Sequence, residues 1–120
     1  MQGFKDLIVY QKAFALAMAI FEITKKFPRE ETYSLIDQIR RSSRSVCGCI
    51  AESYRKRKYP AHFVSKLTDA DMENSETTAW IDFSFACKYI TQQEHTSLLA
   101  RNEEVGRILG NMIQHPDKFL

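Results

Sequence analysis

The sequence predicts an all-α protein, a single domain over residues 1–120 folded as an antiparallel up-down four-helix bundle. Apolar residues recur with helical spacing through four segments, and short connections with proline or capping residues separate these segments. No segment shows the sustained alternation of apolar and polar residues that is typical of a strand, and only four glycines are present. A length of 120 residues is sufficient for one domain with a buried core. Short connections between four helices favour antiparallel neighbours.

The first helix is expected from Phe4 to Phe27, with Asp6 as its N-cap. Phe27 precedes Pro28, and the helix is expected to end there because a residue before proline is disfavoured in the α region. Its apolar residues follow a four-three-four-three spacing, which is typical of an amphipathic helix. This apolar stripe consists of Tyr10, Phe14, Ala17, Phe21 and Thr24, widened by Leu16, Ile20 and Ile23.

The second helix is expected to begin near Glu30 and Glu31, because acidic side chains are favourable in a first turn, and to end at about Tyr54. Its two sides differ in character. One side carries arginines with Gly48 and Ala51 between them, and the other carries an apolar seam with small residues. The seam consists of Leu35, Ile39, Ser42, Val46, Ile50 and Ser53.

Two further helices are expected after Pro60, which suits the first position of a helix. The third runs from about Ala61 to Tyr89. Thr91 and Glu94 form a capping-box pattern that opens the fourth helix, and Pro116 ends it. The seam of the third helix consists of Phe63, Leu67, Ala70, Asn74, Thr77 and Ile81. The apolar positions of the fourth helix are Leu98, Val105, Ile108, Leu109, Met112 and Ile113.

Composition indicates a cytoplasmic protein with reduced thiols and no membrane association. The apolar content of 44% and the charged content of 27% are ordinary for a globular domain. Lys5 and Asp6 interrupt any N-terminal apolar run, so no signal peptide is expected, and the apolar stretch Ala13–Phe21 is too short to span a bilayer. Cys47 and Cys49 point roughly 200° apart on a helix. They are therefore expected neither to pair nor to share a metal.

The sequence offers no constellation for catalysis, a metal or a cofactor, so we expect a protein that is not an enzyme. His62, His95 and His115 lie at helix termini without the spacing to a carboxylate that a helical metal site requires, and we expect them at the surface. The three cysteines, including Cys87, are expected to fill small spaces in the core or at an interface. The carboxylates of the third helix are expected to be solvated or paired with arginine.

Charge is unevenly distributed along the chain, although the net charge is only +2. Gln38–Lys58 contains seven Lys or Arg residues and one acid, Glu52, whereas Thr68–Asp82 contains five acids and no base. The basic residues either pair with the acids of the third helix, are simply hydrated, or contact an anionic partner. Gly48 and Ala51 within the arginine stripe favour the close approach of a partner, which is either a second subunit or RNA.

The basic residues match the electrostatic footprint of a nucleic-acid-binding protein. They would contact phosphates without reading sequence, and the neighbouring tyrosines could stack on bases. The alternative is a protein-interaction scaffold, in which the basic helix pairs with the acidic third helix of a neighbouring subunit. The central arginines face the acids of the third helix if the bundle is antiparallel, so RNA is expected first at the end of the second helix. The candidates are the central arginines Arg40, Arg41 and Arg44, the basic end Arg55, Lys56, Arg57 and Lys58, and the tyrosines Tyr54 and Tyr59.

The chain resembles the 23S ribosomal RNA intervening-sequence protein family over most of its length. The resemblance implies an antiparallel four-helix bundle and a ring-like homopentamer. It also implies kinship with the accessory variability proteins of diversity-generating retroelements, positively charged pentameric barrels that bind a reverse transcriptase and nucleic acid. The segments that carry it are FKDLIVYQKA, FPREETYSLIDQIRRSSRSV, IAESYRKRKY, FVSKLTDADMENSETTAWIDFSFACKYI and GNMIQHPDKF.

Three positions depart from the usual pattern of that family and indicate a distinct subfamily. Cys49 stands where the family usually has asparagine, and Ser53 where it usually has glycine. Midway along the third helix, Met72 and Glu73 replace a common Gly-Ser pair.

Overall fold

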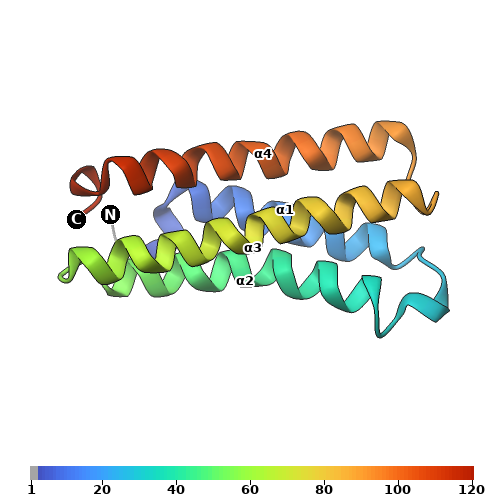
Figure 1. Cartoon of the computed structure of the whole chain (residues 1–120), viewed down its shortest axis with the longest axis horizontal. Coiled ribbons are helices and arrows are strands. Elements are labelled where there is room, and N and C mark those ends of the chain that lie inside the picture. The colour runs from blue at the N-terminus through green and yellow to red at the C-terminus, as the bar shows by residue number, and fades with distance from the viewer. Residues whose placement is uncertain (1–2) are drawn as a thin grey trace.

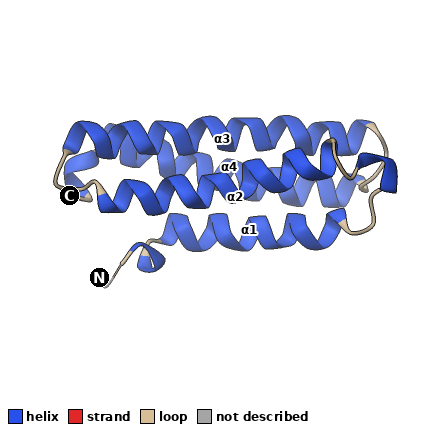
Figure 2. Ribbon diagram, turned by 90° about the horizontal axis from the view of Figure 1, so that it is seen from below, coloured by secondary structure: helices blue, strands red, loops and turns tan. Residues whose placement is uncertain are grey.

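The computed structural model describes residues 3–120, and it confirms an all-α fold of four long helices (Figure 1). The chain runs up and down the long axis four times, so that sequence neighbours are antiparallel and both termini lie at one end (Figure 1). Helix α1 packs on α2 and α4, and α3 packs on α2 and α4, which leaves each helix with two neighbours (Figure 2). The helices are α1 Ile8–Thr24, α2 Leu35–Arg55, α3 Pro60–Ala86 and α4 Gln92–Gln114.

The predicted seams of α2 and α3 form the core of the bundle. All six seam residues of each helix are buried, because the four-three spacing keeps them on the inward side. In α4 the predicted Leu98, Val105, Leu109 and Met112 are also buried. No helix within residues 3–120 combines the length and the apolar character needed to cross a membrane.

Helix α1 is rotated relative to the predicted stripe. Phe14 is 51% exposed, and Tyr10 and Phe21 are only half-buried. Ala17 and Thr24 of the stripe are buried as predicted, and Ala13 lies at the inward side in place of the aromatic rings, which are left at the edge. The small side chains of Ala13 and Ala17 let α1 approach its neighbours closely. The buried residues are Val9, Ala13, Leu16, Ala17, Ile20 and Thr24.

Two predicted helix starts are wrong by a few residues. Asp6 belongs to a short 3₁₀ helix, and Leu7 occupies the N-cap position of α1 without a side-chain cap. Likewise Glu31 lies in a 3₁₀ helix, Arg29–Glu31, and α2 begins only at Leu35. Glu31 still supports that start, because its carboxylate accepts hydrogen bonds from the Leu35 amide at 3.4 Å and from the Ser34 hydroxyl.

The starts of α3 and α4 are confirmed. Pro60 is the first residue of α3. At α4, the Thr91 hydroxyl accepts from the Glu94 amide at 3.0 Å, and the Glu94 carboxylate accepts from the Thr91 amide at 2.9 Å. Helix α3 ends at Ala86, earlier than expected, and Lys88 follows with a left-handed φ of 66°.

Buried polar side chains fix the alignment of the helices. The Ser42 and Thr77 hydroxyls lie 2.8 Å apart between α2 and α3. Between α3 and α4, the Asn74 side chain donates to the Asn102 side chain at 2.9 Å and to its carbonyl at 3.1 Å. Gly106 is required there, because a Cβ at this position would lie 2.9 Å from the Asn74 Oδ1 atom.

Candidate functional site

The central arginines point toward two different helices. Arg41 lies against α3, where its guanidinium donates to Glu73 at 3.0 Å and also to Glu76. The hydrogen bond from Arg41 is the main reason why the pKa of Glu76 is lowered, and it raises the pKa of Arg41 in turn. The predicted pairing with acids of the third helix therefore holds for Arg41, whose charge is compensated within the chain.

Arg40 and Arg44 turn toward α1, so the expectation that they face the acids of α3 is wrong. The Arg40 Nε atom donates to the Thr24 hydroxyl at 2.8 Å. The guanidinium carbons of Arg40 and Arg44 lie 4.6 and 5.5 Å from the centre of the Phe21 ring. Consecutive helical residues point about 100° apart, so Arg40 and Arg41 reach opposite neighbours.

The basic end lies where α2 finishes and its connection to α3 begins. Arg55, Lys56 and Lys58 are exposed. Arg57 folds back, with its Nε atom 3.1 Å from the Tyr54 carbonyl and its guanidinium carbon 3.7 Å from the centre of the Tyr54 ring. Tyr54, Arg55, Arg57 and Lys58 line a surface depression of about 360 Å³.

None of the four basic-end residues forms an ion pair with a carboxylate of residues 3–120. Glu52, the one acid of the basic stretch, is held instead by Lys66 of α3 at 3.0 Å. Cations in the last turn of α2 also interact favourably with its dipole, but that effect extends over only one turn. The positive charge of the basic end is thus left uncompensated.

Two tyrosines flank the basic end, and they differ in burial and in contacts. Tyr54 is half-buried and packs on the core, with Arg57 stacked on it. Tyr59 is 60% exposed at the N-cap position of α3, and its ring meets the His62 ring edge-on at 6.0 Å. Tyr54 therefore positions a guanidinium, whereas Tyr59 is free to stack on a planar group.

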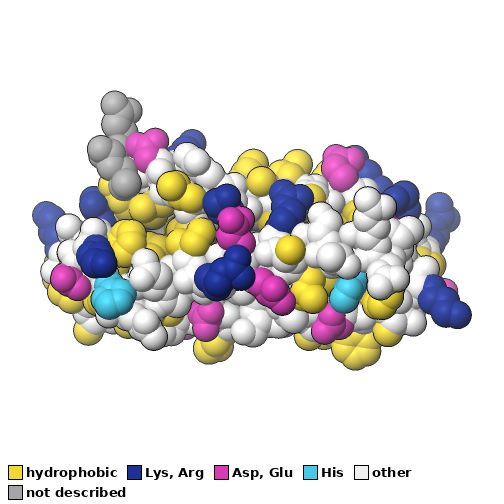
Figure 3. All heavy atoms as spheres, turned by 90° about the horizontal axis from the view of Figure 1, so that it is seen from above, with side chains coloured by type: hydrophobic (Ala, Val, Ile, Leu, Met, Phe, Trp, Pro, Cys, Tyr) yellow, Lys and Arg dark blue, Asp and Glu magenta, His cyan; other side chains and the backbone are white. Residues whose placement is uncertain are grey.

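The surface seen in Figure 3, on the α4 side of the bundle, has a different charge pattern. Cationic and acidic side chains alternate over this face instead of forming a region of one sign (Figure 3). Lys12 of α1, for example, pairs with Glu104 of α4 at 3.2 Å. The basic end therefore differs from this face in that its cations form no ion pair with a carboxylate of the described residues.

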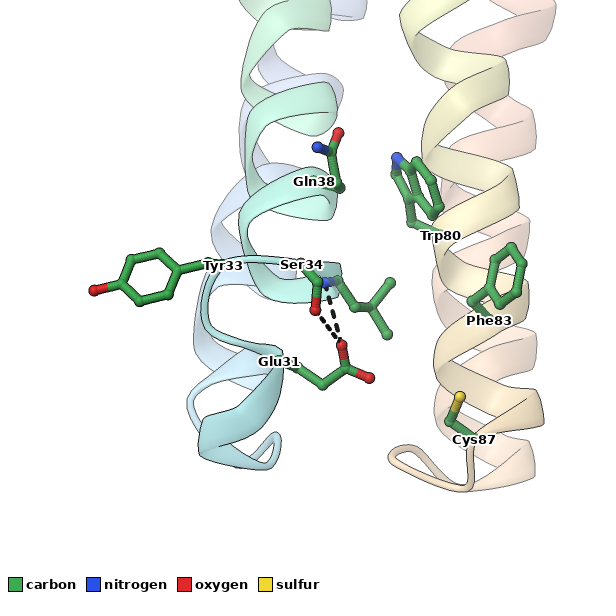
Figure 4. A pocket seen from close by; sticks show the side chains of 8 residues that line it. Glu31, Tyr33, Ser34, Gln38, Trp80, Phe83 and Cys87 are labelled. Carbon is green, nitrogen blue, oxygen red and sulfur yellow. Dashed lines mark hydrogen bonds between the residues drawn. The ribbon is translucent and has the colours of Figure 1, made fainter.

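An apolar depression lies at the other end of α2, between the start of α2 and the end of α3 (Figure 4). Leu35, Trp80 and Phe83 form its apolar walls, and its volume is about 360 Å³. Phe83 is 55% exposed, and the side chain of Tyr33, 93% exposed, points away from the depression (Figure 4). This surface was not predicted from the sequence. Its signal would have been the aromatic residues Trp80, Phe83 and Phe85, which lie close together near the end of the predicted third helix.

Glu31 lines the same depression and is fully hydrogen-bonded. Its carboxylate accepts from Ser34, from the Leu35 amide and from the Tyr89 hydroxyl, the last at 2.8 Å. The hydrogen bond from Ser34, followed by that from Tyr89, lowers the pKa of Glu31. In return, the hydrogen bond to Glu31 raises the pKa of Tyr89 to about 12.

The cysteines and histidines offer no organised chemistry. Burial raises the pKa of the Cys47 thiol to about 11, so it is a poor nucleophile, and Cys87 is exposed instead of filling the core. His62 and His115 are at the surface as predicted. His95 is more enclosed, with its Nε2 atom 2.9 Å from Asp82. Among residues 3–120, no group of three or more His, Cys, Asp or Glu side chains is placed to hold a metal ion.

The relationship to known proteins follows from a family model, "23S rRNA-intervening sequence protein", which matches residues 5–111. The chain belongs to this family. A similar protein of known structure is a protein with unknown function from the S23 ribosomal protein family of Bacteroides thetaiotaomicron. It is similar with 27% identity and a TM-score of 0.81, over 89% of this chain and 96% of that one. Among curated proteins, none matches this chain.

Membership of the 23S rRNA-intervening sequence protein family gives the departures noted in the sequence a structural meaning. Glu73 receives a hydrogen bond from Arg41. Ser53 is buried and donates to the Ile50 carbonyl at 2.7 Å. The charge of one central arginine is therefore compensated in part by a residue at one of these positions.

Proposed function

We propose that this protein is a non-catalytic, self-associating protein that binds RNA through the basic end of α2. The observation that carries the proposal is the uncompensated charge of Arg55, Lys56, Arg57 and Lys58. Cations without carboxylate partners remain available to phosphates, and Arg57 is already held in place by Tyr54. The exposed Tyr59 adds a surface for stacking on a base.

The expected binding mode is electrostatic and independent of sequence. Each phosphate neutralised by a cation releases condensed counterions, so affinity falls as salt rises, with a slope of about −0.7 per contact for a single strand. Four cations on one chain give a modest slope, and a homo-oligomer, expected to be a pentamer, would increase both the slope and the affinity by presenting several basic ends together. Self-association is therefore part of the proposal.

The test is RNA affinity against salt, measured by fluorescence anisotropy with a labelled RNA. The variant Arg55→Glu/Lys56→Glu/Lys58→Glu is expected to lose most binding and most of the salt dependence. The matched control, Arg29→Glu/Lys88→Glu/Arg107→Glu, makes the same change of charge at exposed cations elsewhere and is expected to keep binding. Equal losses in the two variants, or a flat plot of affinity against salt, would exclude RNA binding at the basic end.

A protein-interaction scaffold is the second candidate, and the apolar depression favours it. Trp80 and Phe83 present aromatic surface to solvent beside the exposed Tyr33, and such surfaces commonly take part in protein contacts. A scaffold in which the basic helix pairs with the acidic third helix of a neighbouring subunit is less favoured, because Arg41 already engages Glu73 and Glu76 of its own chain. Contact through the aromatic surface would not require those acids.

Light scattering tests whether the aromatic surface forms the contact between subunits. A scaffold that uses the depression predicts that Phe83→Ser lowers the oligomer mass, from five times the 14.0 kDa chain for a pentamer, while the basic-end variant keeps it. An unchanged mass for Phe83→Ser would exclude this surface as the contact.

A further inference from the structure

We infer that the nucleic acid bound here is single-stranded and that it extends from the basic end along the surface between α1 and α2. This inference rests on the proposed function and names the class of ligand and its path. The path, which we call the α1–α2 track, is formed by two rows of residues. They are Tyr10, Phe14 and Phe21 on α1, and Arg40, Arg44 and Arg55 on α2.

The aromatic row faces α2. Tyr10, Phe14 and Phe21 are four and seven residues apart, which places them on one side of α1. Phe21 contacts the guanidinium groups of Arg40 and Arg44, so this side is the one next to α2. Since α1 and α2 are antiparallel, Phe14 and Tyr10 lie beside successively later turns of α2, toward the basic end (Figure 1).

The cationic row is uncompensated along its length. Neither Arg40 nor Arg44 forms an ion pair with a carboxylate of the described residues, and the same holds for Arg55. At 1.5 Å per residue, Arg40 and Arg55 are about 22 Å apart along the helix, a length on the order of four nucleotides of extended strand. Asp37, which lines a depression with Arg40 and Arg44, marks the far limit of the row.

Between Arg44 and the basic end, the outer side of α2 carries only small side chains. Gly48 and Ala51 lie between Arg44 and Arg55 on the outer side of α2. A Cβ added to Gly48 would meet no atom within 4 Å. No long side chain of α2 therefore separates Arg44 from the basic end on this side, and a backbone can lie close to the helix there.

The exposed rings favour a single strand over a duplex. Phe14 is 51% exposed on the α1 side of the track, and Tyr59 is 60% exposed at the basic end. Unpaired bases can stack on such rings, whereas the bases of a duplex are already stacked on each other, so a duplex is contacted mainly through its phosphates and 2′-hydroxyls. Cations and aromatic rings along one path are the combination that binds single strands without sequence preference.

The test compares a labelled single-stranded oligouridylate with duplex RNA of the same length. We expect the single strand to bind about tenfold more tightly. Phe14→Ala should weaken single-strand binding about fivefold or more and leave duplex binding unchanged. Arg44→Gln should reduce the salt slope by about one contact. The matched control is Met72→Ala, because Met72 is 67% exposed on α3, away from the track, and its loss should change nothing.

The outcomes distinguish this inference from the proposed function. Equal affinity for duplex and single strand, with no effect of Phe14→Ala, would overturn the track while the loss in the basic-end variant upheld RNA binding. If the basic-end variant also bound normally, both would fail. A lower oligomer mass for Phe14→Ala in light scattering would show that a second copy of the chain covers this surface, and would likewise overturn the track.

Discussion

Both ends of α2 carry charged side chains, but only the Glu31 carboxylate at its start has its hydrogen-bond partners within the chain. At its start, the Glu31 carboxylate receives three hydrogen bonds, from Ser34, Leu35 and Tyr89. At its other end, the four cations of the basic end have no carboxylate partner in the described chain. A charge whose partners all lie within the protein is explained by stability, because its contacts already balance the cost of fixing it. A cluster of cations without such partners is either hydrated or bound to an anion, and substitution of these cations distinguishes the two.

Arg41 and Arg44 repeat this contrast one turn apart. Arg41 is compensated by two carboxylates of α3, whereas Arg44 lies near an aromatic ring of α1 without an acid. If charged residues with partners in the chain serve stability and those without partners serve binding, then changes at Glu31 and Arg41 should affect stability alone. Changes at Arg44 and the basic end should affect RNA binding alone.

The largest expected effect is the loss of RNA binding on reversal of the basic end. Arg55→Glu/Lys56→Glu/Lys58→Glu removes three phosphate contacts and adds repulsion, so we expect affinity to fall about 100-fold at moderate salt, or about 2.7 kcal/mol. The melting temperature, measured by circular dichroism, should fall only slightly, through the lost interaction with the α2 dipole, because these side chains are exposed and unpaired. A large fall in melting temperature would show that the basic end has structural partners after all.

The opposite end of α2 should respond in the opposite way. Glu31→Ala removes the acceptor for the Leu35 amide and the Ser34 hydroxyl, and we expect it to destabilise the protein by about 1 kcal/mol at neutral pH with no loss of RNA affinity. Glu30→Ala is the matched control, because Glu30 is an exposed acid in the same 3₁₀ helix.

Acid should produce the same loss in the unaltered protein. The pKa of Glu31 is lowered in the folded state, so its stabilising contribution is fully present above the ordinary pKa of a glutamate and is lost as pH falls through the folded value. The difference in melting temperature between the unaltered protein and Glu31→Ala should therefore shrink between pH 6 and about pH 3. A constant difference would show that the charge of Glu31 is irrelevant.

Helical periodicity was sufficient to predict the fold. The seams of α2 and α3 were predicted residue by residue, because a core position must recur every three or four residues. It was insufficient for α1, where Tyr10, Phe14 and Phe21 are as apolar as the residues that are buried. Which side of such a helix faces inward depends on the close approach permitted by Ala13 and Ala17, a property of packing and not of hydropathy.

The candidate site was predicted in composition but not in arrangement. The basic stretch was evident from the charge of its residues, yet the opposite directions of Arg40 and Arg41 required the positions of both neighbouring helices. The hydrogen bond from Tyr89 to Glu31 joins residues 58 positions apart, which no local pattern reveals. Residues that act through a partner distant in sequence were the ones missed.

A smaller effect is expected at Arg41. Its ion pairs are partly exposed, so Arg41→Met should destabilise the protein by only about 0.5 kcal/mol in urea unfolding, while RNA affinity stays unchanged. Arg44→Met serves as the reciprocal control, with affinity lowered and stability retained. Equal effects of the two substitutions on affinity would remove the distinction between compensated and uncompensated arginines.

The smallest effect is expected at Tyr89, and it tests whether the hydrogen bond from Tyr89 to Glu31 stabilises the start of α2. Its pKa is raised to about 12 because the neutral hydroxyl donates to Glu31, so this stabilisation is fully present below about pH 10 and is lost as pH rises toward 12. Melting temperatures across that window should fall more steeply for the unaltered protein than for Tyr89→Phe, which has no hydroxyl to ionise. Tyr33→Phe is the control, since Tyr33 is 93% exposed and its removal should leave the slope unchanged. Identical slopes for the unaltered protein and Tyr89→Phe would mean that the hydroxyl contributes nothing, and that Glu31 is held by the local contacts of α2 alone.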